Sequence, residues 1–154
     1  MAINKKIEKL RSLAQLDVDA IGTYDAALKR IDVPVLTDRL TEFRGDHVRH
    51  VQELNDCIAK LGGQRVEEKA DLKGAIMKGF TAATSIMGNE AALLAMVGNE
   101  EVTTSTYKAA LKFDWTDEER SLITRNYNDE QRHLAWIKEA ARSRQWAEHR
   151  EAHP

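Results

Sequence analysis

The stretch NYNDEQRHLAWIKEAA, residues 126–141, decides how the rest of the sequence is interpreted. Its apolar residues Leu134 and Ile137 recur at helical spacing and mark one face of a helix. Glu130 and His133 lie on the same side, where a helix of a bundle usually carries aliphatic residues. The stretch therefore predicts a helix that turns a carboxylate and an imidazole toward the protein interior.

The composition indicates a single all-α domain. The chain has 154 residues, enough to bury a sizeable core, and 42% of them are hydrophobic. It has only two prolines, few runs of β-branched residues, and many Ala, Leu, Lys, Glu and Arg residues. These are the residues that favour helices, so we expect one helical domain over residues 1–154.

Charge and hydropathy argue against several classes of partner. The 23 basic and 25 acidic residues leave a net charge of -2, which gives nucleic acid binding no electrostatic support. No run of about twenty apolar residues occurs, and the N-terminal segment lacks the apolar core of a signal peptide. We therefore expect no membrane span and a cytoplasmic protein. A single cysteine, Cys57, excludes an intrachain disulfide and is expected to be a small buried apolar residue.

Apolar residues that recur by threes and fours predict four long helices. These helices cover about residues 4–31, 35–61, 90–112 and 117–147. A shorter amphipathic helix is predicted at about 71–87, inside the long connection between the second and third helices. Pro34 and Gly62 mark the ends of the first two helices. Thr116 and Glu119 predict a capping box at the start of the last one.

The sequence repeats itself with an offset of 83 residues. TYDAALK at 23–29 matches TYKAALK at 106–112, and DHVRH at 46–50 matches DEQRH at 129–133. Because one offset joins matches on different helices, the two halves are interpreted as two copies of a helical hairpin. Short links inside each copy make its helices antiparallel. The long connection between the copies is the crossover that such a four-helix bundle requires.

The offset also pairs six polar residues that interrupt the apolar seams. The pairs are Asp17 with Glu100, His47 with Glu130, and His50 with His133. Each of them lies near the middle of its helix, so antiparallel packing predicts one polar layer inside an otherwise apolar bundle. A buried carboxylate without a partner costs several kcal/mol, and a divalent cation would compensate that cost. The alternative to a metal site is a vestigial polar layer that is hydrated and held by hydrogen bonds.

Carboxylate oxygens and imidazole nitrogens suit iron, manganese or zinc, so we expect all six residues to be metal ligands. Residues three apart on a helix share a face, with Cβ atoms about 5–6 Å apart. Glu130 and His133 can therefore reach one ion or a close pair of ions. Tyr24 and Tyr107 lie two turns beyond the first carboxylate of each half. We expect each to donate a hydrogen bond to a ligand carboxylate on a neighbouring helix, the alternative being an ordinary core tyrosine.

This arrangement resembles the ferritin-like superfamily, in which a helix carboxylate is followed by an E-x-x-H motif on the next helix. EQRH at 130–133 matches that motif, and Glu100 matches the carboxylate before it. The tyrosine spacing resembles bacterioferritin-type sites. LGG at 61–63, the crossover and KAAL at 108–111 look most like a small bacterial branch of the superfamily with a bacterioferritin- or rubrerythrin-type bundle. The resemblance implies a ferritin-like four-helix bundle of two antiparallel hairpins, with a crossover that contains a short extra helix.

The resemblance also implies chemistry: a di-iron or di-manganese centre that reacts with dioxygen or peroxide. The first half departs from the family pattern, because His47 stands where a glutamate would bridge two ions and Asp17 is shorter than the usual glutamate. The site then holds two ions asymmetrically, one ion, or none. Asp46 and Asp129 are expected off the seam, capping the polar layer or facing solvent.

Two functions from different classes follow. The first is a metal-dependent redox protein that oxidises iron, removes peroxide or oxidises a substrate. The second is a metal-free bundle with a vestigial site that acts through association, with the helix at 71–87 as one contact. In that case Trp115, Trp136 and Trp146 would form part of the contact surface rather than the core. Association with further copies of the chain stays open in both cases.

Overall fold

The structure, a computed structural model, describes residues 1–69 and 82–147, and regular structure in these residues is helical. The helices are α1 (Ile3–Leu28), α2 (Pro34–Lys60), α4 (Ala82–Ala110) and α5 (Asp117–Ser143). This confirms the predicted all-α class. Of the short helix predicted at 71–87, residues 71–81 lie outside the described part, and residues 82–87 form the beginning of α4.

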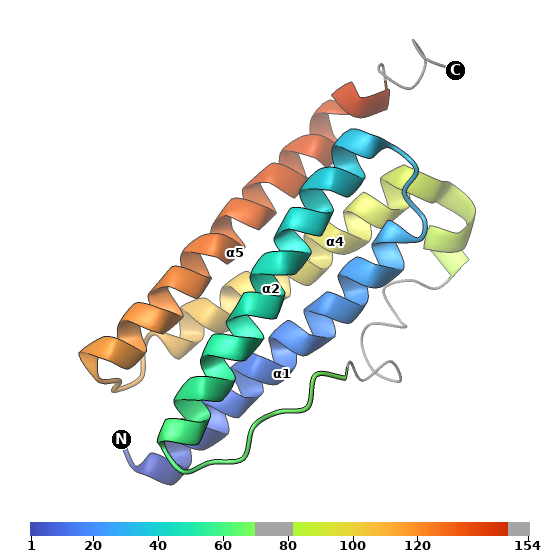
Figure 1. Ribbon diagram of the computed structural model, residues 1–154. Coiled ribbons are helices and arrows are strands. Elements are labelled where there is room, and N and C mark those ends of the chain that lie inside the picture. Colours follow the sequence, from blue (N-terminus) through green and yellow to red (C-terminus); the bar gives the residue numbers. More distant parts are fainter. Residues whose placement is uncertain (70–81, 148–154) are drawn as a thin grey trace.

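The four helices pack as two antiparallel hairpins (Figure 1). α1 packs against α2, and α4 packs against α5. The hairpins meet through α1 with α4 and through α2 with α5. α2 ends beside the start of α1, whereas α4 begins at the opposite end of the bundle, so α2 and α4 run in the same direction. A crossover along the bundle must join them, and its residues 70–81 lie outside the described range.

Two helix ends differ from the prediction. α1 ends at Leu28, with Lys29 as its C-cap, although the buried Ile31 continues the apolar seam. Pro34 does not terminate α1; it is the first residue of α2, where its missing N–H costs no hydrogen bond. α5 ends at Ser143 rather than 147, because Arg144 adopts a left-handed conformation with φ 54°.

Two other boundaries follow from local chemistry. Thr116 accepts a hydrogen bond from the Glu119 backbone, and the Glu119 side chain accepts one from the Thr116 backbone, which confirms the predicted capping box. α4 is kinked at Gly88, where φ 66° and ψ −132° lie in a region that only glycine adopts without strain. The predicted boundary near residue 90 is therefore a kink inside a helical segment.

Two apolar clusters fill the bundle, one toward each end, and both use all four helices. The first is formed by Tyr24, Ala27, Ile31, Val33, Leu36, Leu40, Phe43, Ala92, Leu93, Met96, Ile137, Ala140 and Trp146. The second is formed by Leu10, Leu13, Ala14, Val18, Val51, Leu54, Ile58, Val66, Tyr107, Ala110, Trp115, Leu122 and Ile123. Trp136 packs on the first cluster, so all three tryptophans belong to the core or its edge.

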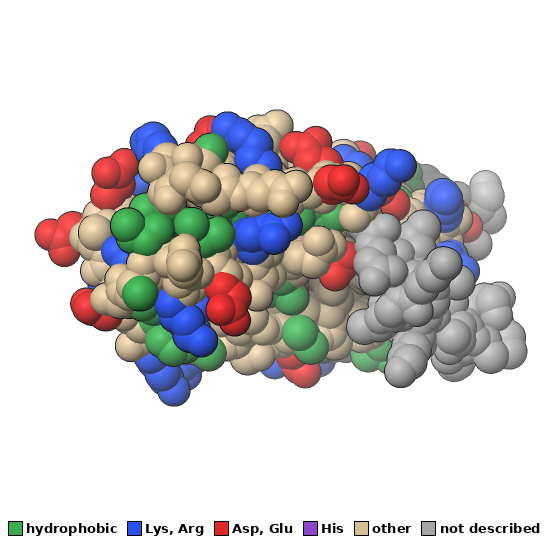
Figure 2. Space-filling view, turned by 90° about the horizontal axis from the view of Figure 1, so that it is seen from below, with side chains coloured by type: hydrophobic (Ala, Val, Ile, Leu, Met, Phe, Trp, Pro, Cys, Tyr) green, Lys and Arg blue, Asp and Glu red, His purple; other side chains and the backbone are tan. Residues whose placement is uncertain are grey.

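The surface carries both signs of charge. On the face shown in Figure 2, basic and acidic side chains are interspersed, and no histidine is visible among its described residues. This distribution agrees with the small net charge of -2. Cys57 is only partly buried, in contrast to the expectation that it would be a core residue. None of the helices in the described segments combines the length and apolar character needed to span a bilayer.

Candidate metal centre

Six buried polar side chains lie together between the two apolar clusters. All have 0% of their surface exposed. They are Asp17 on α1, His47 and His50 on α2, Glu100 on α4, and Glu130 and His133 on α5. The structure thus brings together all six residues that the repeat aligns. Their ligand atoms form two groups that share His47 and Glu130, and within each group the atoms lie within 4.8 Å of one another.

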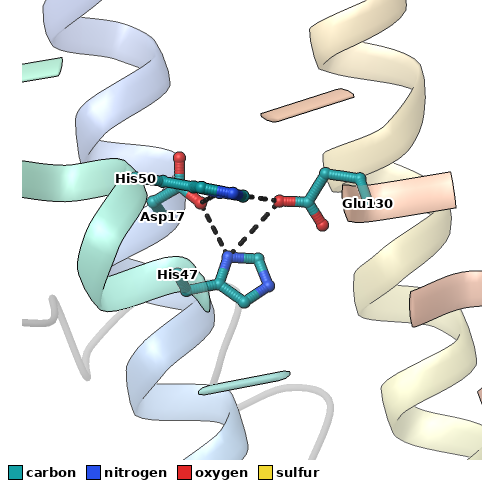
Figure 3. Close-up of side chains that lie close together, drawn as sticks. All are labelled: Asp17, His47, His50 and Glu130. Atoms are coloured by element: carbon teal, nitrogen blue, oxygen red, sulfur yellow. Dashed lines mark hydrogen bonds and ion pairs between the residues drawn. The ribbon is translucent and has the colours of Figure 1, made fainter. Parts of the chain in front are cut away.

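The first group consists of Asp17, His47, His50 and Glu130 (Figure 3). Asp17 Oδ1 lies 2.6 Å from His47 Nδ1 and 3.0 Å from His50 Nδ1. Glu130 Oε1 lies 3.4 Å from His47 Nδ1 and 3.5 Å from His50 Nδ1. Four atoms placed tetrahedrally at about 2.1 Å from one ion would lie about 3.4 Å from one another. The group therefore has roughly the spacing that one metal ion requires, and only its Asp17 contacts are shorter.

The second group consists of His47, Glu100, Glu130 and His133. Glu100 Oε1 lies 3.1 Å from His47 Nε2 and 3.5 Å from His133 Nδ1. Glu130 Oε2 lies 3.6 Å from His133 Nδ1. Glu130 thus turns one oxygen toward each group. Each group could hold one ion with two nitrogen and two oxygen atoms, a mixed set that suits iron, manganese or zinc.

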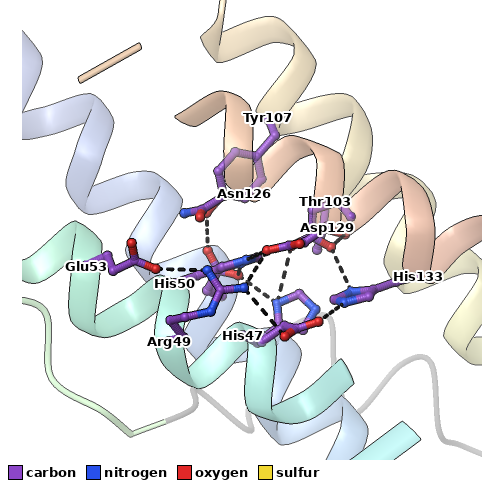
Figure 4. Close-up of polar contacts among 12 residues, drawn as sticks. His47, Arg49, His50, Glu53, Thr103, Tyr107, Asn126, Asp129 and His133 are labelled. Atoms are coloured by element: carbon purple, nitrogen blue, oxygen red, sulfur yellow. Dashed lines mark hydrogen bonds and ion pairs between the residues drawn. The ribbon is translucent and has the colours of Figure 1, made fainter. Parts of the chain in front are cut away.

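The outer nitrogens of two histidines are held by aspartates from the other hairpin (Figure 4). His50 Nε2 donates to Asp129 Oδ2 at 2.9 Å, and His133 Nε2 donates to Asp46 Oδ2 at 2.8 Å. These bonds turn Nδ1 of both rings toward the centre. A carboxylate on the far nitrogen is the usual partner of a metal-binding histidine, because it fixes the ring and the tautomer.

The two aspartates are themselves anchored by arginines. Arg49 donates to Asp129 at 2.6 Å, and Arg132 donates to Asp46 at 2.7 Å. Both aspartate side chains are 20% exposed, so they line the boundary between the buried layer and solvent. The sequence placed these aspartates only as caps of the layer or as solvent-facing residues. The shared D-x-x-R-H pattern of DHVRH and DEQRH was the signal for this pairing.

Two tyrosines reach the ligand carboxylates across the bundle. Tyr24 on α1 donates to Glu100 on α4, and Tyr107 on α4 donates to Asp17 on α1. Burial, reinforced by the carboxylate beside each phenol, raises the pKa of both tyrosines well above 10. Both phenols therefore stay protonated and act as hydrogen-bond donors. Asn126 donates a further bond to the Tyr107 hydroxyl at 3.3 Å.

Thr103 is a buried site residue that the sequence did not reveal. Its hydroxyl lies 2.9 Å from Glu100 Oε2 and 3.1 Å from Glu130 Oε2, so it can donate its one proton to either carboxylate. The internal repeat did not indicate Thr103 as a site residue, because the aligned residue in the first half is Ala20, which has no polar side chain. The layer is therefore asymmetric: only the group that contains Glu100 has such a hydroxyl.

When no cation is bound, protonated histidines balance the negative charge of the buried carboxylates. Burial alone would lower the histidine pKa values, but the surrounding carboxylates outweigh it. They raise the pKa of His50 to about 10, that of His133 to about 9, and that of His47 well above its ordinary value. Burial likewise favours neutral Asp17 and Glu100, yet the histidines lower the pKa of both. The positive charge of the imidazolium rings thus compensates the buried carboxylates, as bound metal ions also would.

Two atoms of the layer have charged neighbours at 3.4–3.6 Å but, among the described residues, no hydrogen bond. Within the part of the chain that the structure describes, Glu130 Oε1 and His133 Nδ1 are buried and make no hydrogen bond. Burial and the nearby Glu100 raise the pKa of Glu130, which marks it as the least compensated carboxylate. Buried polar atoms are rarely left unpaired, and both atoms belong to a group that could hold an ion. The residues present fit a bound cation.

A protein-family model described as "Domain of unknown function (DUF2383)" matches residues 5–113, more than two thirds of the chain. The matched range holds Asp17, His47, His50 and Glu100, and it stops before α5. No curated protein matches the sequence.

Proposed function

Because this chain belongs to the DUF2383 family, whose fold is ferritin-like and whose description assigns no activity, we propose its function from the buried layer itself. The protein binds divalent transition-metal ions, iron foremost, in the two groups of ligands. With iron bound, it acts as a redox protein toward dioxygen or peroxide.

The observation that carries this proposal is the composition and spacing of the two groups. Each offers two imidazole nitrogens and two carboxylate oxygens, all fully buried and within 4.8 Å of one another. A merely structural layer would join its buried polar atoms by hydrogen bonds, whereas Glu130 Oε1 and His133 Nδ1 make none in the described residues and have their charged neighbours at 3.4–3.6 Å. Mixed nitrogen and carboxylate ligands suit iron, manganese and zinc, and of these three iron most readily supplies electrons to an oxidant.

The protein's own residues have three tasks at such a site. His50 and His133 are oriented by Asp129 and Asp46, so that their inner nitrogens face the ligand groups. Phe43 stacks on His133 with ring centroids 4.3 Å apart and helps to exclude water on that side. The two aspartates, whose side chains are partly exposed to solvent, hold the Nε2 protons of these rings and leave the Nδ1 atoms free to bind metal.

The association function has less support. Trp115 and Trp146, two of the proposed contact residues, are buried in the two apolar clusters. Most of the helix predicted at 71–87, the other proposed contact, lies outside the described residues. The described residues therefore favour the metal-binding function.

Anaerobic titration of the metal-free protein with iron(II) tests the proposal. The wild type should bind one to two equivalents per chain, and Glu130→Ala/His133→Ala should bind none. The matched control is Glu139→Ala/Arg142→Ala, which removes an exposed ion pair with the same spacing on α5 and should bind like the wild type. Retention of wild-type iron by the Glu130→Ala/His133→Ala protein would overturn the assignment.

A further inference from the structure

His47 faces both ligand groups with opposite edges of one ring. Its Nδ1 lies 2.6 Å from Asp17 Oδ1 and 3.4 Å from Glu130 Oε1. Its Nε2 lies 3.1 Å from Glu100 Oε1, on the other side. Figure 3 shows the first nitrogen directed at Asp17 and Glu130, and the second turned away from that group. A single imidazole thus contacts carboxylates that come from α1, α5 and α4.

The other two histidines each direct only one ring nitrogen toward the ligand groups. His50 and His133 turn only Nδ1 toward the centre, because Nε2 of each is occupied by an aspartate outside the six residues. His47 has no such outer partner among the residues that the structure describes; its hydrogen bonds are those to Asp17 and Glu100. Its ring is fully buried beside Tyr24 and His133, with centroids 5.3 Å and 5.2 Å away. A histidine that binds one ion usually donates a hydrogen bond from its other nitrogen to a group that is not a ligand, and His47 makes no such bond in the described residues.

We propose that His47 bridges the two metal positions, with Nδ1 bound to the ion beside Asp17 and His50, and Nε2 bound to the ion beside Glu100 and His133. The inference rests on the proposed function, since it requires that both groups bind metal. When both metal–nitrogen bonds form, the two ring N–H protons leave to solvent and the ring becomes an imidazolate. Its negative charge lies between the two cations and reduces their repulsion.

Glu130 would connect the same two positions in parallel. Its Oε1 faces His47 Nδ1 and His50, and its Oε2 faces His133. Glu130 would thus offer one oxygen to each of the two positions that His47 joins. The occupants are pairs of divalent ions that bind imidazole well, a class that includes copper, zinc, nickel and iron.

A shared ligand and an unshared ligand have different effects on stepwise binding. If His47 bridges, His47→Gln removes one ligand from each ion and should weaken both binding steps. His50→Gln, the matched control on the same helix, removes a ligand from one ion and should weaken one step only. We expect losses of at least about tenfold, because removal of even an outer partner of a ligand commonly costs that much.

Copper(II) is the probe for the bridge, because an isolated copper(II) ion has one unpaired electron and gives an electron paramagnetic resonance signal. Two copper(II) ions on one imidazolate couple magnetically, and their signal disappears at low temperature. The wild type should show the signal with one equivalent and lose it as the second equivalent binds. His47→Gln loaded to the same copper content should keep the signal of uncoupled ions.

A second measurement needs no variant. In protein that contains ¹⁵N-labelled histidine and two equivalents of zinc(II), nuclear magnetic resonance should find both His47 nitrogens bound to metal and without a proton. His50 and His133 should each keep the Nε2 proton that the structure directs at an aspartate.

The outcomes separate the two proposals. If the wild type binds neither copper(II) nor zinc(II), the proposed function and the bridge both fail. If it binds one ion only, or two uncoupled ions, or if His47 keeps a ring proton, the metal site stands and the bridge is wrong. The bridge is also wrong if His47→Gln retains the coupling, because Glu130 alone would then connect the ions.

Discussion

Metal affinity at the buried layer should rise steeply between pH 7 and pH 9, because metal ions must displace protons from the histidines. In the metal-free protein the neighbouring carboxylates outweigh burial, which alone would lower both values. They hold the pKa of His50 at about 10 and that of His133 at about 9. A metal-binding imidazole must have a free nitrogen lone pair, so each ion that binds at neutral pH releases protons.

The size of the effect follows from these pKa values. One pKa unit corresponds to 1.36 kcal/mol, so removal of the proton at pH 7 costs about 4 kcal/mol for His50 and about 3 kcal/mol for His133. The apparent affinities at pH 7 should then lie roughly a thousandfold and a hundredfold below those of the neutral imidazoles. Each further pH unit should raise the affinity of each position at least about tenfold until the pH passes that pKa, because His47, whose pKa is also raised, must lose a proton as well.

Calorimetric titration with zinc(II), in competition with a chelator of known affinity, measures this dependence. Parallel titrations in buffers with different ionisation enthalpies count the protons released, and we expect at least one per bound ion. The control is His149→Gln/His153→Gln, which removes the two histidines outside the described residues and should leave the slope unchanged. An affinity that stays constant or falls between pH 7 and pH 8 would show that metal binding does not displace protons from His50 and His133.

Three further predictions concern the surroundings of the ligands. The metal-free protein should lose stability as the pH rises from 7 to 10 in urea titrations. The raised pKa values of His50 and His133 stabilise the fold fully only below pH 6.5. A gain in stability over this range would show that these histidines are not protonated in the folded protein. Asp46→Ala frees His133 Nε2 and should weaken one metal-binding step by about 10–100-fold in the same zinc titration; an unchanged affinity would deny Asp46 an orienting role. Thr103→Val removes the hydroxyl between two carboxylates and should destabilise the metal-free protein by about 1–3 kcal/mol in thermal unfolding; unchanged stability would exclude this role.

The four helices could be predicted because each has an apolar seam with helical period, and the hairpins could be paired because the repeat has one offset. The end of α1 was missed for a physical reason. Ile31 continues the seam and is 5% exposed, but it lies in the loop after α1 and packs from there into the first apolar cluster. Period alone does not distinguish the two cases. Pro34 was compatible with either a helix end or a helix start, and it starts α2.

Sequence reasoning located the six buried residues because polar residues on an apolar seam are costly and therefore conspicuous. It missed Thr103, because a threonine is unremarkable on a helix face and its counterpart Ala20 carries no hydroxyl. The sequence also could not predict that the two ring nitrogens of His47 face different ligand groups. This arrangement depends on the positions of Asp17 and Glu100 across the bundle, which no single helix determines.

The most direct test of the metal centre is a crystal structure of the protein loaded with zinc(II), with anomalous diffraction recorded at the zinc absorption edge. We expect two anomalous peaks inside the bundle, one beside Asp17 and His50 and the other beside Glu100 and His133, with His47 and Glu130 between them. Anomalous peaks confined to surface carboxylates, with none among the six buried side chains, would contradict it.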